Sequence, residues 1–170
     1  MVEVADYSQL LKMSEFWKRI SAEKVLIFQS DSIMLRFGID RYLRYDYIGA
    51  PWNMHTNDIA MEMYRKGILV EGVGNGGFSL RSVNAMKRIT DMFGNSSLST
   101  EPEDLFFARN LQRLQYTIAP HYEAYAFCME VKIEDYEREF NKVYHLALHA
   151  SWYYLKESES RELLLGSIPK

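Results

Sequence analysis

The chain has 170 residues, a length that fits one domain able to bury most of its apolar surface, and we expect a single domain over residues 1–170. Its 20 basic and 23 acidic side chains give a net charge of −3 and are interspersed, which argues against the basic stripe of a nucleic-acid-binding protein. No stretch approaches the roughly 18 apolar residues that span a bilayer, so we expect neither a nucleic-acid partner nor a transmembrane segment.

The first predicted elements are a helix and a strand. Leu10, Leu11 and Trp17 recur at helical spacing and predict a helix over Tyr7–Ile20. Residues Lys24–Phe28 (KVLIF) are apolar and partly β-branched, which predicts a short strand buried on both faces. The chain turns polar immediately after this strand.

The middle of the chain is less regular. Ile39–Tyr45 predicts a short helix, and Asp46–Pro51 predicts a strand ended by its proline. Residues 52–73 are weakly patterned and predict a loop with one helical turn. Gly74–Gly77 predicts a sharp break before a short strand over Phe78–Leu80.

Two helices follow. Ser82 is a suitable N-cap for a helix that ends near Phe93, with Gly94 just beyond it. After a loop, Glu103–Leu114 predicts a helix with two acids in its first turn, and the remainder has less clear boundaries. The alternation of strands and helices predicts an α/β fold with a mostly parallel sheet.

The single cysteine and the N-terminal segment indicate in which cellular compartment we expect the protein. Cys128 lies in the apolar run 126–129, where a free cysteine most often serves as a small core residue. One cysteine forms no intrachain disulfide, and the amphipathic first twenty residues lack the continuous apolar core of a signal peptide. We therefore expect a cytoplasmic protein.

Asp31 is the first candidate site residue. It follows the strand Lys24–Phe28 closely, and a carboxylate at the C-terminal end of a strand lies where α/β sheets bind ligands. Such a carboxylate can supply one oxygen ligand to a hard divalent cation while phosphates supply others. A solvated turn aspartate is the more frequent use of this residue type.

The glycine-rich segment Gly74–Gly77 is the second candidate. Three glycines in four residues cost backbone entropy, which is justified where the backbone takes a positive φ or lies against a ligand. The segment is not a P-loop, because the terminal Gly-Lys-Ser/Thr is missing. A tight structural turn explains it about equally well.

The third and fourth candidates are acids and histidines. Glu103 and Asp104 either stabilise a helix N-terminus or offer a general base. His145 and His149 have the i, i+4 spacing of one helical face, which suits zinc only weakly because the glutamate of a metalloprotease motif is missing. A structural histidine is the default, and a single histidine that binds metal or phosphate is the better functional alternative.

Five strings in order resemble a known group of proteins. They are FQSDS at Phe28–Ser32, YDYIGAPW at Tyr45–Trp52, GNGGFSLRS at Gly74–Ser82, EDLFF at Glu103–Phe107, and a histidine followed by tryptophan at His149–Trp152. Across about residues 7–155 they are similar to a poorly characterised group of glycosyltransferase-like proteins. The glycine-rich string is the most specific of the five.

The resemblance implies a GT-A-like fold with a nucleotide-sugar donor, a carbohydrate acceptor and a divalent metal, Mn²⁺ or Mg²⁺. The Asp-x-Asp of GT-A enzymes aligns with Gln29, Ser30 and Asp31, so the second acid is kept and the first is glutamine. By the same resemblance Asp31 and His149 bind the metal, and Gln29 and Ser30 lie beside the donor.

The resemblance also implies the remaining site residues. Asn75, Gly76 and Gly77 would border the sugar subsites, and Glu103 or Asp104 would face the acceptor hydroxyl. GT-A proteins normally begin with a nucleotide-binding βαβ half of roughly 60–100 residues. Only 30 residues precede Asp31, so we expect that half to be truncated and the sheet edge left behind to favour self-association.

Two other functions compete with glycosyl transfer. One is a non-catalytic sugar- or partner-binding module that retains the scaffold. The other is a metal-dependent phosphoesterase that uses Asp31, Glu103, Asp104 and His149. We rank this last because such hydrolases cluster their Asp and His residues in short motifs, whereas this chain spreads them thinly.

Overall fold

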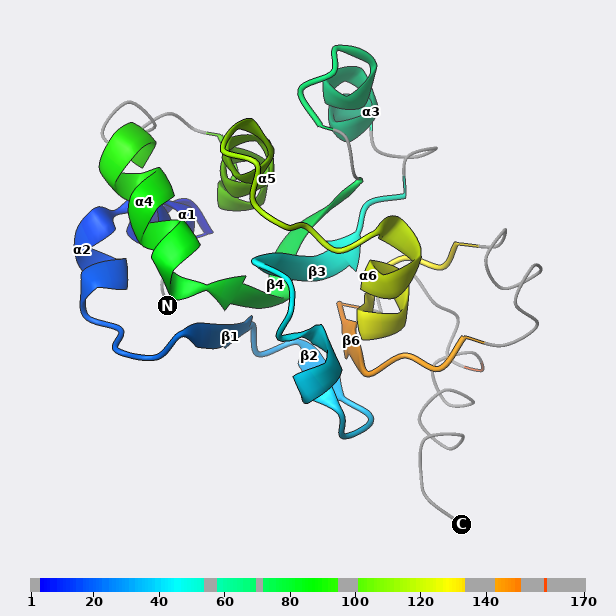
Figure 1. The fold of residues 1–170 in the computed structure, drawn as a ribbon. Coiled ribbons are helices and arrows are strands. Elements are labelled where there is room, and N and C mark those ends of the chain that lie inside the picture. The colour runs from blue at the N-terminus through cyan, green and yellow to red at the C-terminus, as the bar shows by residue number, and fades with distance from the viewer. Residues whose placement is uncertain are drawn as a thin grey trace.

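A computed structural model shows a mixed α/β protein with helices and two small sheets (Figure 1). The structure describes residues 4–53, 58–69, 72–94, 101–133 and 143–150 together with residue 158. Within these ranges no helix is long and apolar enough to cross a membrane.

The elements in chain order are α1 (Val4–Lys12), α2 (Ser14–Lys18), β1 (Lys24–Phe28), β2 (Ser32–Met34), the 3-10 helix η1 (Ile39–Tyr42), β3 (Tyr47–Pro51), α3 (Asp58–Arg65), β4 (Val73–Ser82), α4 (Val83–Phe93), α5 (Glu103–Arg113), α6 (His121–Phe127), β5 (Cys128–Met129) and β6 (Ala147–His149).

The first sheet, sheet A, has the order β1-β4-β3, and both of its strand pairs are antiparallel. The long central strand β4 places Leu80 opposite Leu26 of β1 and Ile48 of β3. The prediction of a mostly parallel sheet is therefore wrong. Helices α4 and α5 come after β4, the last strand of this sheet in the chain, so they connect none of its strands, and both pack against β4.

The second sheet, sheet B, is mixed and lies next to the end of β1 (Figure 1). Its order is β2-β6-β5, with β2 antiparallel and β5 parallel to the central β6. The register pairs Ser32 with His149 and Met129 with Leu148. These pairings bring together segments that are far apart in the sequence.

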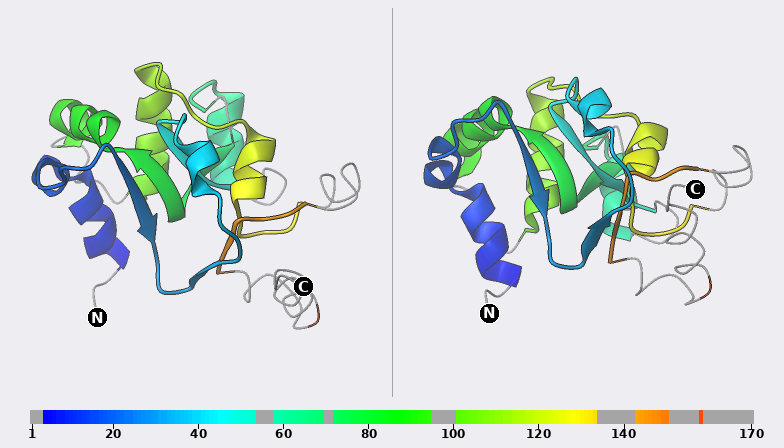
Figure 2. Two further views of the ribbon diagram at one scale, coloured as in Figure 1. Left: turned by 60° about the horizontal axis from the view of Figure 1, so that its bottom comes forward. Right: turned by 90° about the horizontal axis from the view of Figure 1, so that it is seen from below.

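Helices α1, α2, α4 and α5 pack together on one flank, and α6 packs on β3 (Figures 1 and 2). Trp17 of α2 is fully buried, and its ring meets that of Phe107 edge to face at 5.8 Å. Its indole Nε1 donates to the Leu11 carbonyl at 2.6 Å, which ties α2 to α1. The predicted single helix over 7–20 is thus two helices, separated at the extended residue Met13.

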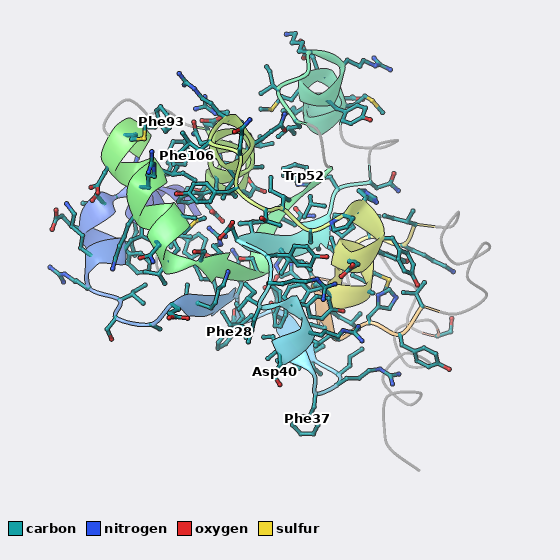
Figure 3. All side chains as sticks on the ribbon, in the orientation of Figure 1. Phe28, Phe37, Asp40, Trp52, Phe93 and Phe106 are labelled. Atoms are coloured by element: carbon teal, nitrogen blue, oxygen red, sulfur yellow. The ribbon has the colours of Figure 1, made fainter. Side chains whose placement is uncertain are left out.

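Several predicted elements are confirmed. Strand β1 has the predicted bounds, and α4 begins after Ser82, whose hydroxyl accepts from the Ala85 N–H. Cys128 is a buried core residue, and burial raises the pKa of its thiol. The prediction that this segment is a buried central strand is wrong, because β1 lies at the edge of sheet A, is half-buried, and ends at Phe28, which is 67% exposed (Figure 3).

Two local predictions are also corrected. Gly74–Gly77 does not break the chain but lies inside β4, where the register against β3 shifts between Gly49 and Ala50. His145 and His149 do not share a helical face, because Ala147–His149 is a strand. Residues 95–100 of the predicted loop and the C-terminal tail lie outside the described residues, except Ser158.

Candidate functional site

Sheet B assembles a cluster from three distant parts of the chain. Asp31 immediately precedes β2, Glu130 immediately follows β5, and His149 ends β6. The pairing of Ser32 with His149 and of Met129 with Leu148 places the three residues side by side. The Ala150 N–H donates to the Asp31 carbonyl at 3.0 Å and fixes the two chain segments at this point.

The His149 ring lies between the two acids. Its Nε2 is 3.4 Å from Asp31 Oδ1 and 3.1 Å from Gln29 Oε1, and its Nδ1 is 3.5 Å from Glu130 Oε2. We call these four residues the His149 cluster. The histidine is only 7% exposed, whereas the Asp31 side chain is 30% exposed and so remains accessible from solvent.

Three buried polar atoms of the cluster have no hydrogen-bond partner in the described structure. They are Asp31 Oδ1, Glu130 Oε2 and His149 Nδ1. They belong to the contacts of 3.4 and 3.5 Å between the ring and the two acids, so a protonated imidazole pairs with both acids, and a bound cation or polar ligand is the alternative.

The acids also set the protonation of His149. Burial alone lowers the pKa of its imidazole, because it disfavours the charged form. The carboxylates of Glu130 and Asp31 outweigh this effect and raise the pKa above its ordinary value. The cluster therefore stabilises positive charge at the ring.

Gly77 of β4 makes room for the histidine. A Cβ at this position would lie 2.1 Å from the His149 ring. The Gly77 carbonyl accepts from the Gln29 N–H at 2.8 Å and from the Ser32 hydroxyl at 3.1 Å, which holds the turn between β1 and β2 against β4.

Gly76 makes room for a buried ion pair. Both guanidinium ends of Arg81 donate to Glu103, at 2.7 Å to Oε2 and 3.0 Å to Oε1. A Cβ on Gly76 would lie 1.9 Å from Glu103 Oε1. Arg81 is fully buried and lies over the rings of Tyr47 and Phe107.

The third glycine, Gly74, lies against the Trp52 ring, which a Cβ would meet at 2.0 Å. None of the three glycines of this segment has a positive φ. Their small size is therefore required by the protein's own side chains, Trp52, Glu103 and His149. The sequence predicted a turn or a nearby ligand at these glycines and did not reveal this role.

Asp104 lies next to the ion pair, at the N-terminus of α5. It is half-buried, and its Oδ1 accepts from the Leu105 N–H at 2.8 Å. Burial, reinforced by the negative charge of Glu103, raises the pKa of Asp104 to about 7. The charge of Glu130 makes a smaller contribution in the same direction.

Asp31 and His149 could together supply two ligands to a divalent cation. Mg²⁺ ligands lie at about 2.0–2.1 Å, so two adjacent ligand atoms around one ion are roughly 3 Å apart, close to the spacing of Asp31 Oδ1 and His149 Nε2. Among the described residues no group of three or more His, Cys, Asp or Glu has the geometry to hold a metal by itself. An ion at this point would complete its coordination with phosphate oxygens and water, as Mg²⁺ usually does.

The other predicted site residues lie apart from the four that form the cluster. Ser30 is exposed in the turn after β1, and half-buried Asn75 lies on β4 opposite Ala50. His145 faces elsewhere: its Nδ1 lies 2.8 Å from the Tyr125 carbonyl oxygen, and the two rings meet edge to face. The helical zinc pair with His149 is therefore wrong. Trp152 lies outside the described residues.

Glu130 is a site residue that sequence reasoning missed. The signal was nonetheless present, because Glu130 follows an apolar run that forms β5 much as Asp31 follows β1. What the sequence did not reveal was that β5 lies parallel to β6.

Comparison with known families assigns the chain. Residues 1–149 match the family described as "Protein of unknown function (DUF5672)", and the chain belongs to this family. The matched range contains the whole His149 cluster as well as Arg81, Glu103 and Asp104. No curated protein and no solved structure matches the chain.

Proposed function

We propose that this protein is a GT-A-like glycosyltransferase that transfers a sugar from a metal-bound nucleotide-sugar donor to an acceptor hydroxyl. The observation that carries the proposal is the 3.4 Å approach of Asp31 Oδ1 to His149 Nε2 at the end of β1. A carboxylate oxygen that has no hydrogen bond to the described residues meets an imidazole nitrogen there, although the chain segments that bear them are far apart in the sequence.

Asp31 and His149 would hold the cation in this proposal. Mn²⁺ or Mg²⁺ bound there supplies the positive charge that stabilises a leaving nucleoside diphosphate. Gln29, whose side-chain amide is 3.1 Å from His149 Nε2, would border the same site. Exposed Ser30 and the accessible side of Asp31 would face the diphosphate.

Asp104 is the best candidate for the general base. With a pKa of about 7, the carboxylate is about half ionised near neutral pH and is more basic than an ordinary aspartate, so it can accept a proton. As the acceptor oxygen attacks the anomeric carbon, the acceptor proton passes to Asp104 and the bond to the diphosphate breaks.

Glu103 has a different role in the proposal. Both of its oxygens accept from Arg81 within the core, so it holds α5 against β4 beside Asp104. Asn75 and the neighbouring glycines of β4 would border the sugar, because their segment links the ion pair to the His149 cluster.

Calorimetric titration with MnCl₂ and a panel of nucleoside diphosphate sugars tests this function. We expect donor binding that requires Mn²⁺ and that weakens at least tenfold in Asp31→Asn. Asp40→Asn is a matched control, because Asp40 is an exposed acid on η1, outside the cluster (Figure 3). Its binding should equal that of the unaltered protein.

Other outcomes would contradict the proposal in distinct ways. Sugar binding that is independent of Mn²⁺ and of Asp31 would favour a non-catalytic sugar-binding module. Hydrolysis of a generic phosphodiester without a donor sugar would favour a phosphoesterase.

A further inference from the structure

A groove lies between η1 and α6, which are side by side in the structure (Figure 2, cyan and yellow). Its volume of about 420 Å³ falls in the range of roughly 300–1,000 Å³ that small-molecule sites occupy. Polar and aromatic side chains dominate its lining, among them Arg41, Tyr42, Arg44, Tyr122, Glu123 and Tyr144. We call this hollow the η1–α6 groove, and none of the four residues of the His149 cluster lines it.

The η1–α6 groove is basic in a chain whose net charge is −3. Among the described residues that line it, Arg41 and Arg44 stand against one acid, Glu123. Asp40, the acid of η1, does not line the groove and lies on the side of η1 away from α6 (Figure 3). The positive charge is therefore local, and it favours an anionic ligand.

The arginines at this groove are held flat on aromatic rings. Each guanidinium carbon lies 4.6 or 4.7 Å from the centroid of a tyrosine ring, in the pairs Arg36–Tyr144, Arg41–Tyr42 and Arg44–Tyr45. Stacking of this kind orients a long side chain and leaves N–H groups at the edge of the guanidinium.

The three arginines differ in how far the protein already occupies them. Arg44 donates to the Arg41 carbonyl at 2.6 Å and pairs with Glu123 across the groove. Arg41 is exposed, and the buried Nε of Arg36 has no hydrogen-bond partner among the described residues. We therefore expect Arg36 and Arg41 to be the arginines that bind an added anion.

A phosphate monoester matches the charge and the geometry of this place. The three arginines and Glu123 together leave two positive charges, and a phosphate monoester carries about −1.5 to −2 at pH 7. The N–H groups of a guanidinium can bind two phosphate oxygens at once. Tyr122 and Tyr144 are 37% and 54% exposed, so their rings can cover the apolar face of a sugar.

We propose that the η1–α6 groove binds a sugar phosphate, with Arg36 and Arg41 on the phosphate and Tyr122 and Tyr144 against the sugar ring. This site is separate from the His149 cluster. It needs neither a cation nor a nucleotide, so it does not depend on the function proposed above.

Calorimetry of the full chain with glucose 1-phosphate, glucose 6-phosphate and mannose 6-phosphate tests the site. The buffer contains EDTA, which excludes binding through a divalent cation. We expect at least one ester to bind, and its affinity to fall about tenfold or more in Arg36→Gln and in Arg41→Gln. Arg41→Lys should lose less, because it keeps the charge but not the fork of N–H donors. Arg65→Gln, at an exposed position of α3 outside the groove, is the matched control and should bind like the unaltered protein.

Inorganic phosphate and glucose separate the two halves of the ligand. We expect inorganic phosphate to bind about tenfold more weakly than the ester, and glucose to show no measurable binding. Tyr122→Ala should weaken binding of the ester and leave that of inorganic phosphate unchanged, whereas Tyr64→Ala, an exposed tyrosine of α3, should change neither. Circular dichroism checks that each variant is folded.

Two results would overturn the site itself: no binding of any of the three esters, or equal binding in the arginine variants and the unaltered protein. Equal affinities for the ester and inorganic phosphate would overturn the assignment of a sugar to the groove.

Discussion

The Arg81–Glu103 pair and the His149 cluster lie against neighbouring glycines of one strand, yet they are built differently. In the first, two charges are fully buried and bonded through two contacts of 2.7 and 3.0 Å. In the second, contacts of 3.4 and 3.5 Å join acids to a histidine, and three polar atoms have no hydrogen bond to any residue that the structure describes. The ion pair thus completes its hydrogen bonds within the core, whereas the cluster retains polar atoms beside an accessible carboxylate.

The largest expected effect comes from breaking the ion pair. Glu103→Leu leaves the Arg81 charge buried and unpaired, which should lower the free energy of unfolding by about 3–5 kcal/mol. Urea denaturation measures the change. The double variant Arg81→Met with Glu103→Leu should recover much of the loss. Glu62→Gln, in an exposed ion pair with Lys66, should change nothing measurable. A single variant as stable as the unaltered protein would contradict a structural role for the pair.

A methyl group at Gly77 should disturb the cluster more than the fold. Its Cβ would lie 2.1 Å from the His149 ring, so the imidazole must move. We expect Gly77→Ala to cost about 1–3 kcal/mol of stability and to abolish Mn²⁺ binding. Thermal unfolding and calorimetry measure the two effects. Gly67→Ala, at an open position with a positive φ, is a control that should lose stability without losing affinity.

Asp104 makes the stability of the protein depend on pH. Its pKa in the folded protein is about 7, whereas an unfolded aspartate titrates near pH 4. Between these values the folded state retains a proton that the unfolded state has lost, so the free energy of unfolding falls as pH rises from 4 to 7. Asp104→Asn should remove the part of this fall that comes from Asp104, which denaturation at several pH values measures. Identical pH profiles would show that the acid is not perturbed.

Asp31→Asn should have the smallest effect on stability among these variants. Its Oδ1 has no hydrogen bond among the described residues, and its 3.4 Å ion pair with His149 is made by a side chain that is 30% exposed. We expect a change within about 0.5 kcal/mol by urea denaturation. A loss as large as that of Glu103→Leu would erase the distinction between the two regions.

The edges of sheet A offer a further comparison. The outer edge of β3 is covered at Tyr47 by residues 118 and 119, whereas nothing in the described structure pairs with the outer edge of β1. The Gln29 N–H donates to the Gly77 carbonyl of β4. Because backbone groups alternate between the two edges of a strand, every second residue counted from Gln29 faces β4, and the N–H and C=O of Leu26 face the outer edge. We predict self-association through β1, reduced in Leu26→Pro. Light scattering that shows a monomer at all concentrations would contradict it.

Local elements were predictable from the sequence because they depend on neighbouring residues. The apolar run of β1, the serine that caps α4 and the acids at the start of α5 each carry their own signal. Asp31 stood out for the same reason, as the acid beyond a strand.

The long-range arrangement was not predictable. Antiparallel pairing of β1 with β4, and the meeting of β2, β5 and β6, depend on contacts between distant segments. The spacing of His145 and His149 suits a helix, but His149 is held in a strand by its neighbours in sheet B. Glu130 escaped notice because only that sheet brings it to the histidine.

The central claim is that Asp31 and His149 bind one divalent cation together. Crystals of the full chain grown with Mn²⁺ and a nucleoside diphosphate allow the ion to be located by its anomalous scattering. We predict one peak within bonding distance, about 2–2.5 Å, of both Asp31 Oδ1 and His149 Nε2. A peak elsewhere, or no peak at saturating Mn²⁺ with the two side chains still in contact, would contradict the claim.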